Sequence, residues 1–158
     1  MNAAYEELIS LLDEREVGYQ CSDEDQSIAT TFRGDVGNFR VFAQVDSDIQ
    51  LFQIFGYSPI RIPEGARPAI AQAVARANYG LRVGKFELDL DDGEIRFQTA
   101  HVLQDDAVGQ DVIDRLIGNT VSMLDLYLPA FLSVVYGNED PKDAIACVEA
   151  GVRRVEPS

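Results

Sequence analysis

The sequence has few of the residues from which most catalytic and metal sites are built. Its 158 residues include one histidine, His101, two cysteines, Cys21 and Cys147, and no tryptophan. A lone histidine without CxxC, HxxxH or HExxH spacing argues against zinc, and no GxSxG supports a serine triad. No GxxxxGK[ST] or GxGxxG phosphate-binding loop is present. We therefore expect no enzymatic activity, no metal and no cofactor.

Positive charge is also scarce. The chain has 13 basic and 27 acidic residues, and its formal net charge is −14. This excess argues against binding to nucleic acid, because phosphates require Lys and Arg, and against an anionic membrane surface. Two explanations stay open for the acidic balance: an ordinary solvated surface, or a basic partner selected by charge.

Long hydrophobic runs are absent. The most apolar stretch is LYLPAFLSVVY, residues 126–136, which contains Pro129. It is about half as long as the ~20 residues that a membrane-spanning helix needs, so we expect a buried helix. The N-terminal stretch MNAAYEELISLL has acids where a signal peptide has a basic region. Together with the unpaired cysteines, this predicts a cytoplasmic protein with no membrane partner.

The hydrophobic periodicity predicts one α+β domain over 1–158, with a loose tail at 152–158. Alternation with period two marks the strands, and apolar residues at three- and four-residue spacing mark the helices. Residues 21–26 read as a polar loop. The predicted order is α-β-β-β-α-β-β-α(-α), with helices at 3–15, 69–80, 110–136 and after Pro141, and strands at 27–34, 38–46, 49–56, 83–90 and 94–102.

Five acidic residues surround Gly93 in FELDLDDGEIRFQTA, residues 86–100. A calcium loop of the EF-hand type would need oxygen ligands where Leu88 and Leu90 stand, and helices rather than strands on either side. Asp-Gly between two alternating apolar runs is instead a strong hairpin signal. The stretch therefore predicts a tight turn at 91–93, with Gly93 at positive φ.

The segment 49–56 is apolar on both faces, with Leu51 and Phe55 on one and Phe52 and Ile54 on the other. We expect Phe52 and Ile54 to face away from the core and, with Phe42, to form a protein-interaction patch. The last helix could cover this patch, or a second copy could. The second copy is favoured because the alanine-rich helix at 69–79 would allow close approach, although its alanines also suit a helix for propensity alone.

Pro129 interrupts the longest helical pattern. Its ring lacks the amide proton that the carbonyl of Asp125 would accept, so we expect a break or bend within one turn of Pro129. Asp125 is charged within an apolar run, so it should face water or a partner.

One longer stretch points to a known family. Residues 77–100, ANYGLRVGKFELDLDDGEIRFQTA, combine an asparagine at a helix end, a Gly-Lys-Phe-x-Leu-Asp strand, an Asp-Gly turn and an Ile-x-Phe strand. This stretch resembles the YbjN family of bacterial proteins, and LDLYLPAFLSVVYGNEDPKDAI resembles the C-terminal helix of that family. The matching positions are Asn78, Gly84, Phe86, Leu88, Asp89, Asp92, Gly93, Ile95 and Phe97.

The YbjN family is similar in turn to the chaperones of type III secretion systems. The resemblance implies a five-stranded antiparallel sheet packed against helices, a homodimer and no catalytic residues. The first hypothesis is therefore a non-enzymatic protein-binding or chaperone-like module that acts as a homodimer. The alternatives are a small-molecule-binding regulatory domain or minor enzyme, with a pocket between the long C-terminal helix and the sheet, and a structural subunit of a larger assembly.

Overall fold

The computed structural model describes residues 2–153, and within them the predicted α+β architecture is confirmed. An antiparallel sheet packs against helices, but the sheet has six strands instead of the predicted five. The elements are α1 (Ala3–Glu14), β1 (Tyr19–Ser22), β2 (Ser27–Arg33), β3 (Asn38–Asp46), β4 (Leu51–Arg61), the 3-10 turn η1 (Glu64–Ala66), α2 (Arg67–Tyr79), β5 (Lys85–Leu88), β6 (Glu94–Val102), α3 (Gln110–Gly137) and α4 (Pro141–Arg153).

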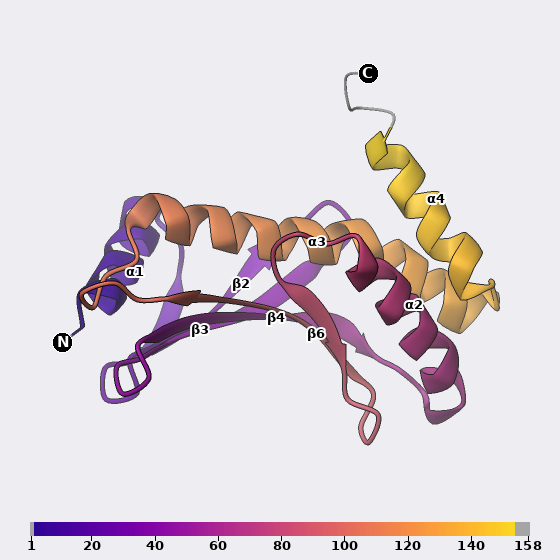
Figure 1. Ribbon diagram of the computed structural model, residues 1–158, viewed down its shortest axis with the longest axis horizontal. Helices are drawn as coiled ribbons and strands as arrows, with labels where there is room; N and C mark the ends of the chain where they lie inside the picture. The colour runs from indigo at the N-terminus through magenta and orange to yellow at the C-terminus, as the bar shows by residue number, and fades with distance from the viewer. Residues whose placement is uncertain (1, 154–158) are drawn as a thin grey trace.

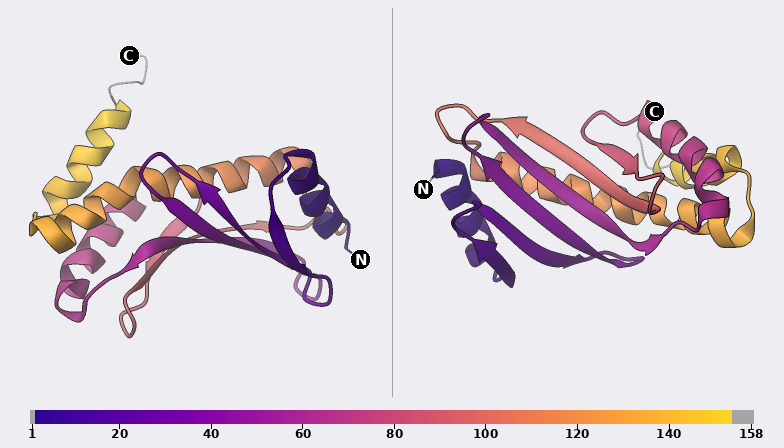
Figure 2. Two further views of the ribbon diagram at one scale, coloured as in Figure 1. Left: turned by 180° about the vertical axis from the view of Figure 1, so that it is seen from behind. Right: turned by 90° about the horizontal axis from the view of Figure 1, so that it is seen from below.

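The sheet has the strand order β1-β2-β3-β4-β6-β5, and every neighbouring pair is antiparallel. Helix α3 runs across one face of the sheet, with α1 near one end and α2 and α4 near the other (Figure 1). The view from below in Figure 2 shows the strands in front of α3. The described part of the chain thus covers one face of the sheet and leaves the opposite face uncovered.

The additional strand is β1, which pairs with β2 from Tyr19↔Thr30 to Ser22↔Ser27. The predicted polar loop at 21–26 is wrong for Cys21 and Ser22, which belong to β1. β1 has only four residues and lies at the sheet edge, so it shows too little alternation of apolar and polar residues to stand out in the sequence.

The buried side chains form two clusters along α3. One gathers around α2, α4, β5 and the second half of α3, and the other around α1, β3 and the first half of α3. Val121 is the one side chain, among those described, that packs against both. The predicted stripe of α3 is confirmed in its main part by the buried residues Ile113, Leu116, Ile117, Thr120, Leu124, Tyr127, Leu128 and Phe131.

Gly56 brings α3 close to β4 at the middle of the sheet. A Cβ atom built on Gly56 would lie 2.6 Å from Leu124 Cδ1 and 2.7 Å from Thr120 Cγ2. Any larger residue at this position would therefore push the helix away from the strand. The contact leaves no space for a ligand, so the alternative prediction of a pocket between the long helix and the sheet gains no support here.

Pro129 does not divide the long helix. α3 continues as one element from Gln110 to Gly137, so the predicted break is absent, although its axis inclines over the C-terminal turns in Figure 1. Asp125, one turn before the proline, is half-buried, and its carboxylate accepts hydrogen bonds from the amides of Asp35 (2.9 Å) and Val36 (2.8 Å). The partner expected for Asp125 is thus the β2–β3 turn of the same chain.

The hairpin prediction at 91–93 is confirmed. Gly93 has φ +79° and joins β5 to β6. The Asp89 carboxylate accepts from the amide of Asp91 (2.8 Å), and the Asp92 carboxylate from the amide of Glu94 (2.9 Å). These acidic residues stabilise the turn by hydrogen bonds to its own backbone. The Glu94 amide and then Arg61 lower the pKa of Asp92.

The segment that leads into α3 is held by another helix. Gly109 occupies the N-cap position and has no side chain to accept from the first amides of the helix. The Glu7 carboxylate of α1 accepts from the amides of Val108 (3.3 Å) and Gly109, the two residues before the helix. At the other end of the chain, α4 continues to Arg153, so the predicted loose tail is wrong for 152–153, and 154–158 lie outside the described residues.

Candidate functional site

The uncovered face of the sheet carries aromatic and arginine side chains in adjacent rows. Phe42 of β3 is paired with Phe55 of β4, and the next row joins Arg40 to Tyr57. Tyr57 is in turn paired with Arg96 of β6. The three aromatic residues are only half-buried, because no helix packs over them. We call this surface the open face, made up of Ala29, Thr31, Arg33, Arg40, Phe42, Gln44, Leu51, Gln53, Phe55, Tyr57, Lys85, Glu87, Arg96 and Gln98.

The arginines of the open face lie over its rings. The guanidinium of Arg96 is 4.6 Å from the ring centroid of Phe55, and that of Arg40 is 5.4 Å from the centroid of Tyr57. Arg96 Nε also donates to Glu87 Oε1 at 2.8 Å. Burial acts to lower the pKa of Arg96, but Glu87, together with Tyr57, raises it overall. Arg96 is therefore a fixed cation on an aromatic surface.

A shallow hollow of about 810 Å³ lies on the β1–β4 side of this face. Ala29, Thr31, Phe42 and Tyr57 line it, and Arg40 contributes its charge. The hollow is open to solvent and its lining is mixed, as in the interfaces that proteins form with other proteins.

The predicted interaction patch is wrong in two of its three residues. Phe52 and Ile54 are fully buried, in the cluster around α1 and α3. Burying each side chain contributes about 1.5–3 kcal/mol, so the sheet places this pair on the helical side. Phe42 does lie on the open face, opposite Phe55. α4 packs near α2 and α3, so it does not cover the open face as one alternative supposed.

A sequence signal for the correct face of β4 was present. Alternate residues of a strand lie on the same face. Gln53 and Tyr57 are therefore on the face of Leu51 and Phe55, whereas Gly56 is on the face of Phe52 and Ile54. Polar atoms belong on the exposed side of a strand, and a glycine marks close approach of another element. Phe55, Tyr57, Arg40 and Arg96 were the open-face residues that the hydrophobic pattern alone did not identify.

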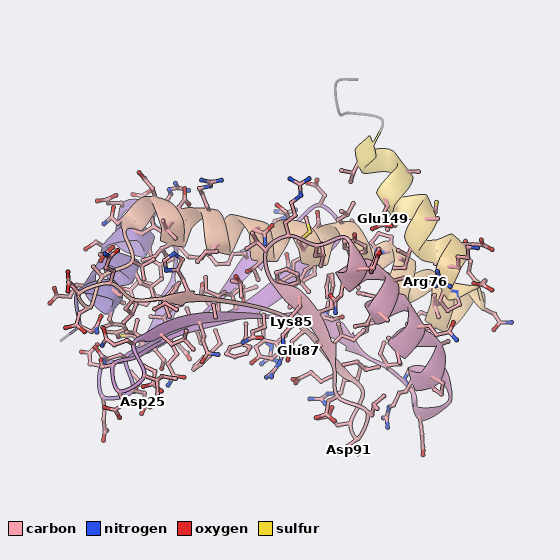
Figure 3. The ribbon with its side chains drawn as sticks, in the orientation of Figure 1. Asp25, Arg76, Lys85, Glu87, Asp91 and Glu149 are labelled. Atoms are coloured by element: carbon pink, nitrogen blue, oxygen red, sulfur yellow. The ribbon has the colours of Figure 1, made fainter. Side chains whose placement is uncertain are left out.

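A second surface lies between α2 and α4. Tyr79, at the end of α2, is 95% exposed. The small side chains of Ala75 and Ala146 form a depression beside it, and charges of both signs border it: Arg76 and Glu149 are labelled in Figure 3. We call this surface the α2–α4 face; its lining is Gln72, Ala75, Arg76, Tyr79, Lys142, Ile145, Ala146 and Glu149.

The residues able to do acid, base or thiol chemistry lie apart from each other. His101 is exposed at the end of β6, and its Nδ1 lies 2.8 Å from the carbonyl of Val102. Cys21 and Cys147 are exposed free thiols. Within residues 2–153 no group of three His, Cys, Asp or Glu is placed to hold a metal ion. By length and composition α3 could span a membrane, but its buried stripe packs on the sheet.

These observations define a small α+β domain whose distinctive features are exposed surfaces rather than a cavity with reactive groups. The chain belongs to the YbjN family, whose description is "Putative bacterial sensory transduction regulator" and which matches residues 4–133. The fold is that of the crystal structure of YbjN, "a putative transcription regulator from E. coli", with a TM-score of 0.58 and 11% identity over 78% of this chain and 86% of that one. No curated protein sequence matches the chain.

Proposed function

We propose that this protein is a non-enzymatic, cytoplasmic protein-binding module of a bacterial regulatory system and that it acts as a homodimer. The family description supports a regulator. The single observation that carries protein binding is the open face, where Phe42, Phe55 and Tyr57 lie only half-buried on the side of the sheet that no helix among the described residues covers. Contiguous aromatic surface of this kind usually marks an interface, and Tyr and Arg are the side chains that contribute most to interfaces.

Site-specific photocrosslinking in cells tests the open face. A photoreactive phenylalanine analogue at Phe55 should form an adduct with a partner protein, whereas the same analogue at Ser122, exposed on α3, should not. The captured protein is then purified and titrated against wild type and Tyr57→Ala. We expect binding that Tyr57→Ala weakens at least tenfold. Equal adducts at both positions, or no binding by the purified protein, would contradict the proposal.

A different surface supports the homodimer. On the α2–α4 face the small Ala75 and Ala146 allow a second backbone to approach, and Tyr79 projects beside them. In a dimer with two-fold symmetry, the same surface of both copies meets. Electrostatic attraction between the copies therefore requires that this surface carry both positive and negative side chains. Arg76 and Glu149 supply one charge of each sign.

Light scattering during size-exclusion chromatography tests the dimer. The chain has a mass of 17.4 kDa, so the wild type should elute at about twice that mass. Tyr79→Ser and Arg76→Glu should each give a folded monomer, and combining Arg76→Glu with Glu149→Arg should restore the dimer. Tyr136→Ser, which changes a tyrosine that is 71% exposed elsewhere on α3, is the matched control. A wild-type monomer would show the homodimer proposal to be wrong.

A further inference from the structure

The open face has a charge opposite to that of the rest of the protein. The formal net charge of the chain is −14. The rows of the open face nevertheless hold four basic side chains, Arg33, Arg40, Lys85 and Arg96, against three acids, Glu87, Glu94 and, at one end, Asp46. Lys85 and Arg96 both contact Glu87, at 3.6 Å and 2.8 Å. Neither Arg33 nor Arg40 forms an ion pair within the described residues.

Of the two arginines without an ion pair, Arg40 is the one that lies beside apolar side chains. The nearby Glu94 lines the same hollow, but it is paired with Arg61 at 3.6 Å. Arg40 instead lies over the ring of Tyr57, which orients its guanidinium and leaves its donors free. The same hollow is lined by Phe42 and Ala29. A ligand that fills it would have to offer a carboxylate and an apolar group close together.

The two ends of the sheet carry the opposite charge. Figure 3 shows Asp25 at the lower left and Asp91 at the lower tip of the β5–β6 hairpin, with Lys85 and Glu87 nearer the middle of the molecule. Asp46 and Asp48 lie at the β3–β4 turn, where the open face ends. Exposed charges more than roughly 8 Å apart are largely screened from each other at physiological salt. A ligand bound at the centre of the open face therefore interacts mainly with the basic side chains of that centre. A carboxylate would be repelled at both ends and held in the middle, and this fixes where it binds.

We infer that the open face binds an acidic, apolar segment of a partner protein and that Arg40 receives one of its carboxylates. This inference rests on the proposed function and adds the chemistry of the partner. A second copy fits this face poorly, because its own basic centre would meet the same basic centre. Nucleic acid fits poorly as well, because the acidic ends and the net charge of −14 oppose a phosphate backbone.

The test uses three short fluorescein-labelled peptides and fluorescence anisotropy. The first alternates Glu with Leu and Phe, the second replaces Glu by Lys, and the third replaces Leu and Phe by Ser. We expect the first alone to bind. Arg40→Gln should weaken that binding about tenfold to a hundredfold, as loss of a hydrogen bond to a charged group does. Arg115→Gln, the same charge change on the exposed side of α3, is the control and should bind as wild type does.

Nuclear magnetic resonance locates the bound peptide. Amide signals of β3 and β4 should shift on addition of the acidic peptide, and the same spectrum shows that Arg40→Gln is folded. Equal weakening by both arginine variants would mean a net-charge effect and would overturn the inference. Tighter binding of the lysine peptide, or of a single-stranded oligonucleotide, would overturn it too. If the protein captured at Phe55 binds while the acidic peptide does not, the proposed function stands and this inference fails.

Discussion

The side chain of Asn78 is hydrogen-bonded to the backbone of Phe86 on both of its polar groups. Its Nδ2 donates to the carbonyl of Phe86 at 2.9 Å, and its Oδ1 accepts from the amide of Phe86 at 2.8 Å. A neighbouring strand would make the same two bonds. Asn78, at the end of α2, therefore occupies the outer edge of β5, which has four residues and a neighbouring strand, β6, on one side only. An edge strand whose outer backbone groups have no partner invites pairing with other chains. Asn78 occupies two of those groups in β5.

Replacing Asn78 by Ala should lower the free energy of unfolding by about 1–3 kcal/mol, because both backbone groups of Phe86 lose their partner. The variant should also aggregate faster on warming, since the edge of β5 becomes free. Asn119→Ala removes one hydrogen bond, of 3.1 Å to the carbonyl of Val83, and is the matched control. Urea unfolding followed by circular dichroism measures both variants. Equal effects of the two would show that Asn78 has no special role.

Asp125 joins the middle of α3 to the β2–β3 turn, and its removal should loosen that turn. Asp125→Ala should lower the free energy of unfolding by about 1–3 kcal/mol, because the amides of Asp35 and Val36 lose a charged acceptor. Asp125→Asn keeps one acceptor oxygen, so its free energy of unfolding should lie between those of Asp125→Ala and wild type. Amide exchange at Asp35 and Val36 should quicken in Asp125→Ala. Unchanged exchange there would contradict the assignment.

Gly93 should tolerate no side chain. It has φ +79°, and a Cβ atom would lie 2.2 Å from the backbone carbonyl oxygen of Ile62. Gly93→Ala should therefore lower the free energy of unfolding by about 2 kcal/mol or more. Gly65→Ala is the control, because nothing lies within 4 Å of its Cβ. Thermal unfolding compares the two, and a Gly93→Ala melting temperature equal to that of wild type would disprove the predicted clash.

Two tyrosines should make the protein sensitive to alkaline pH. The hydrogen bond from Tyr19 to Asp13, with burial, raises the pKa of Tyr19 to about 12. Burial and then Asp23 raise the pKa of Tyr5 as well. A tyrosine in the unfolded chain loses its proton at about pH 10. The folded state therefore holds these protons longer, and its stability is full below about pH 10 and falls as pH rises through the folded pKa values.

Urea unfolding at a series of alkaline pH values measures this dependence. The free energy of unfolding should decline less steeply for Tyr5→Phe and Tyr19→Phe than for wild type, because each removes one titrating group. Tyr136→Phe changes an exposed ring and should follow the wild-type curve. Identical slopes for all the proteins would refute the prediction.

Local chemistry made much of the fold predictable. Asp-Gly chemistry defined the turn at 91–93, and three- and four-residue spacing defined α3. β1 was missed because four edge residues carry too little periodic information. Of the break or bend predicted at Pro129, the break is absent, while the axis of α3 inclines over its C-terminal turns (Figure 1); the helix stays continuous because the stripe on either side of Pro129 is buried against the sheet and α4.

The open face was harder to predict than the fold. Strand periodicity separates two sets of side chains but does not say which set meets a helix when both contain large apolar residues. Phe52 and Ile54 were assigned to the wrong side for this reason. Arg40, Tyr57 and Arg96 come together only through the pairing of β3, β4 and β6. Their proximity depends on strand register across three segments, which no single segment specifies.

The position of Val121 between the two buried clusters suggests that the domain opens in halves. Only α3 and the central strands link the cluster around α1 to the cluster around α2 and α4. Local opening of one half need not disturb the other, because Val121 is the one side chain, among those described, that packs against both clusters. Native-state hydrogen exchange should then resolve two cooperative units, with amides of α1 and β2 exchanging at a different free energy from those of α2 and β5. A protein built in this way can stay folded at one end while the other end changes shape.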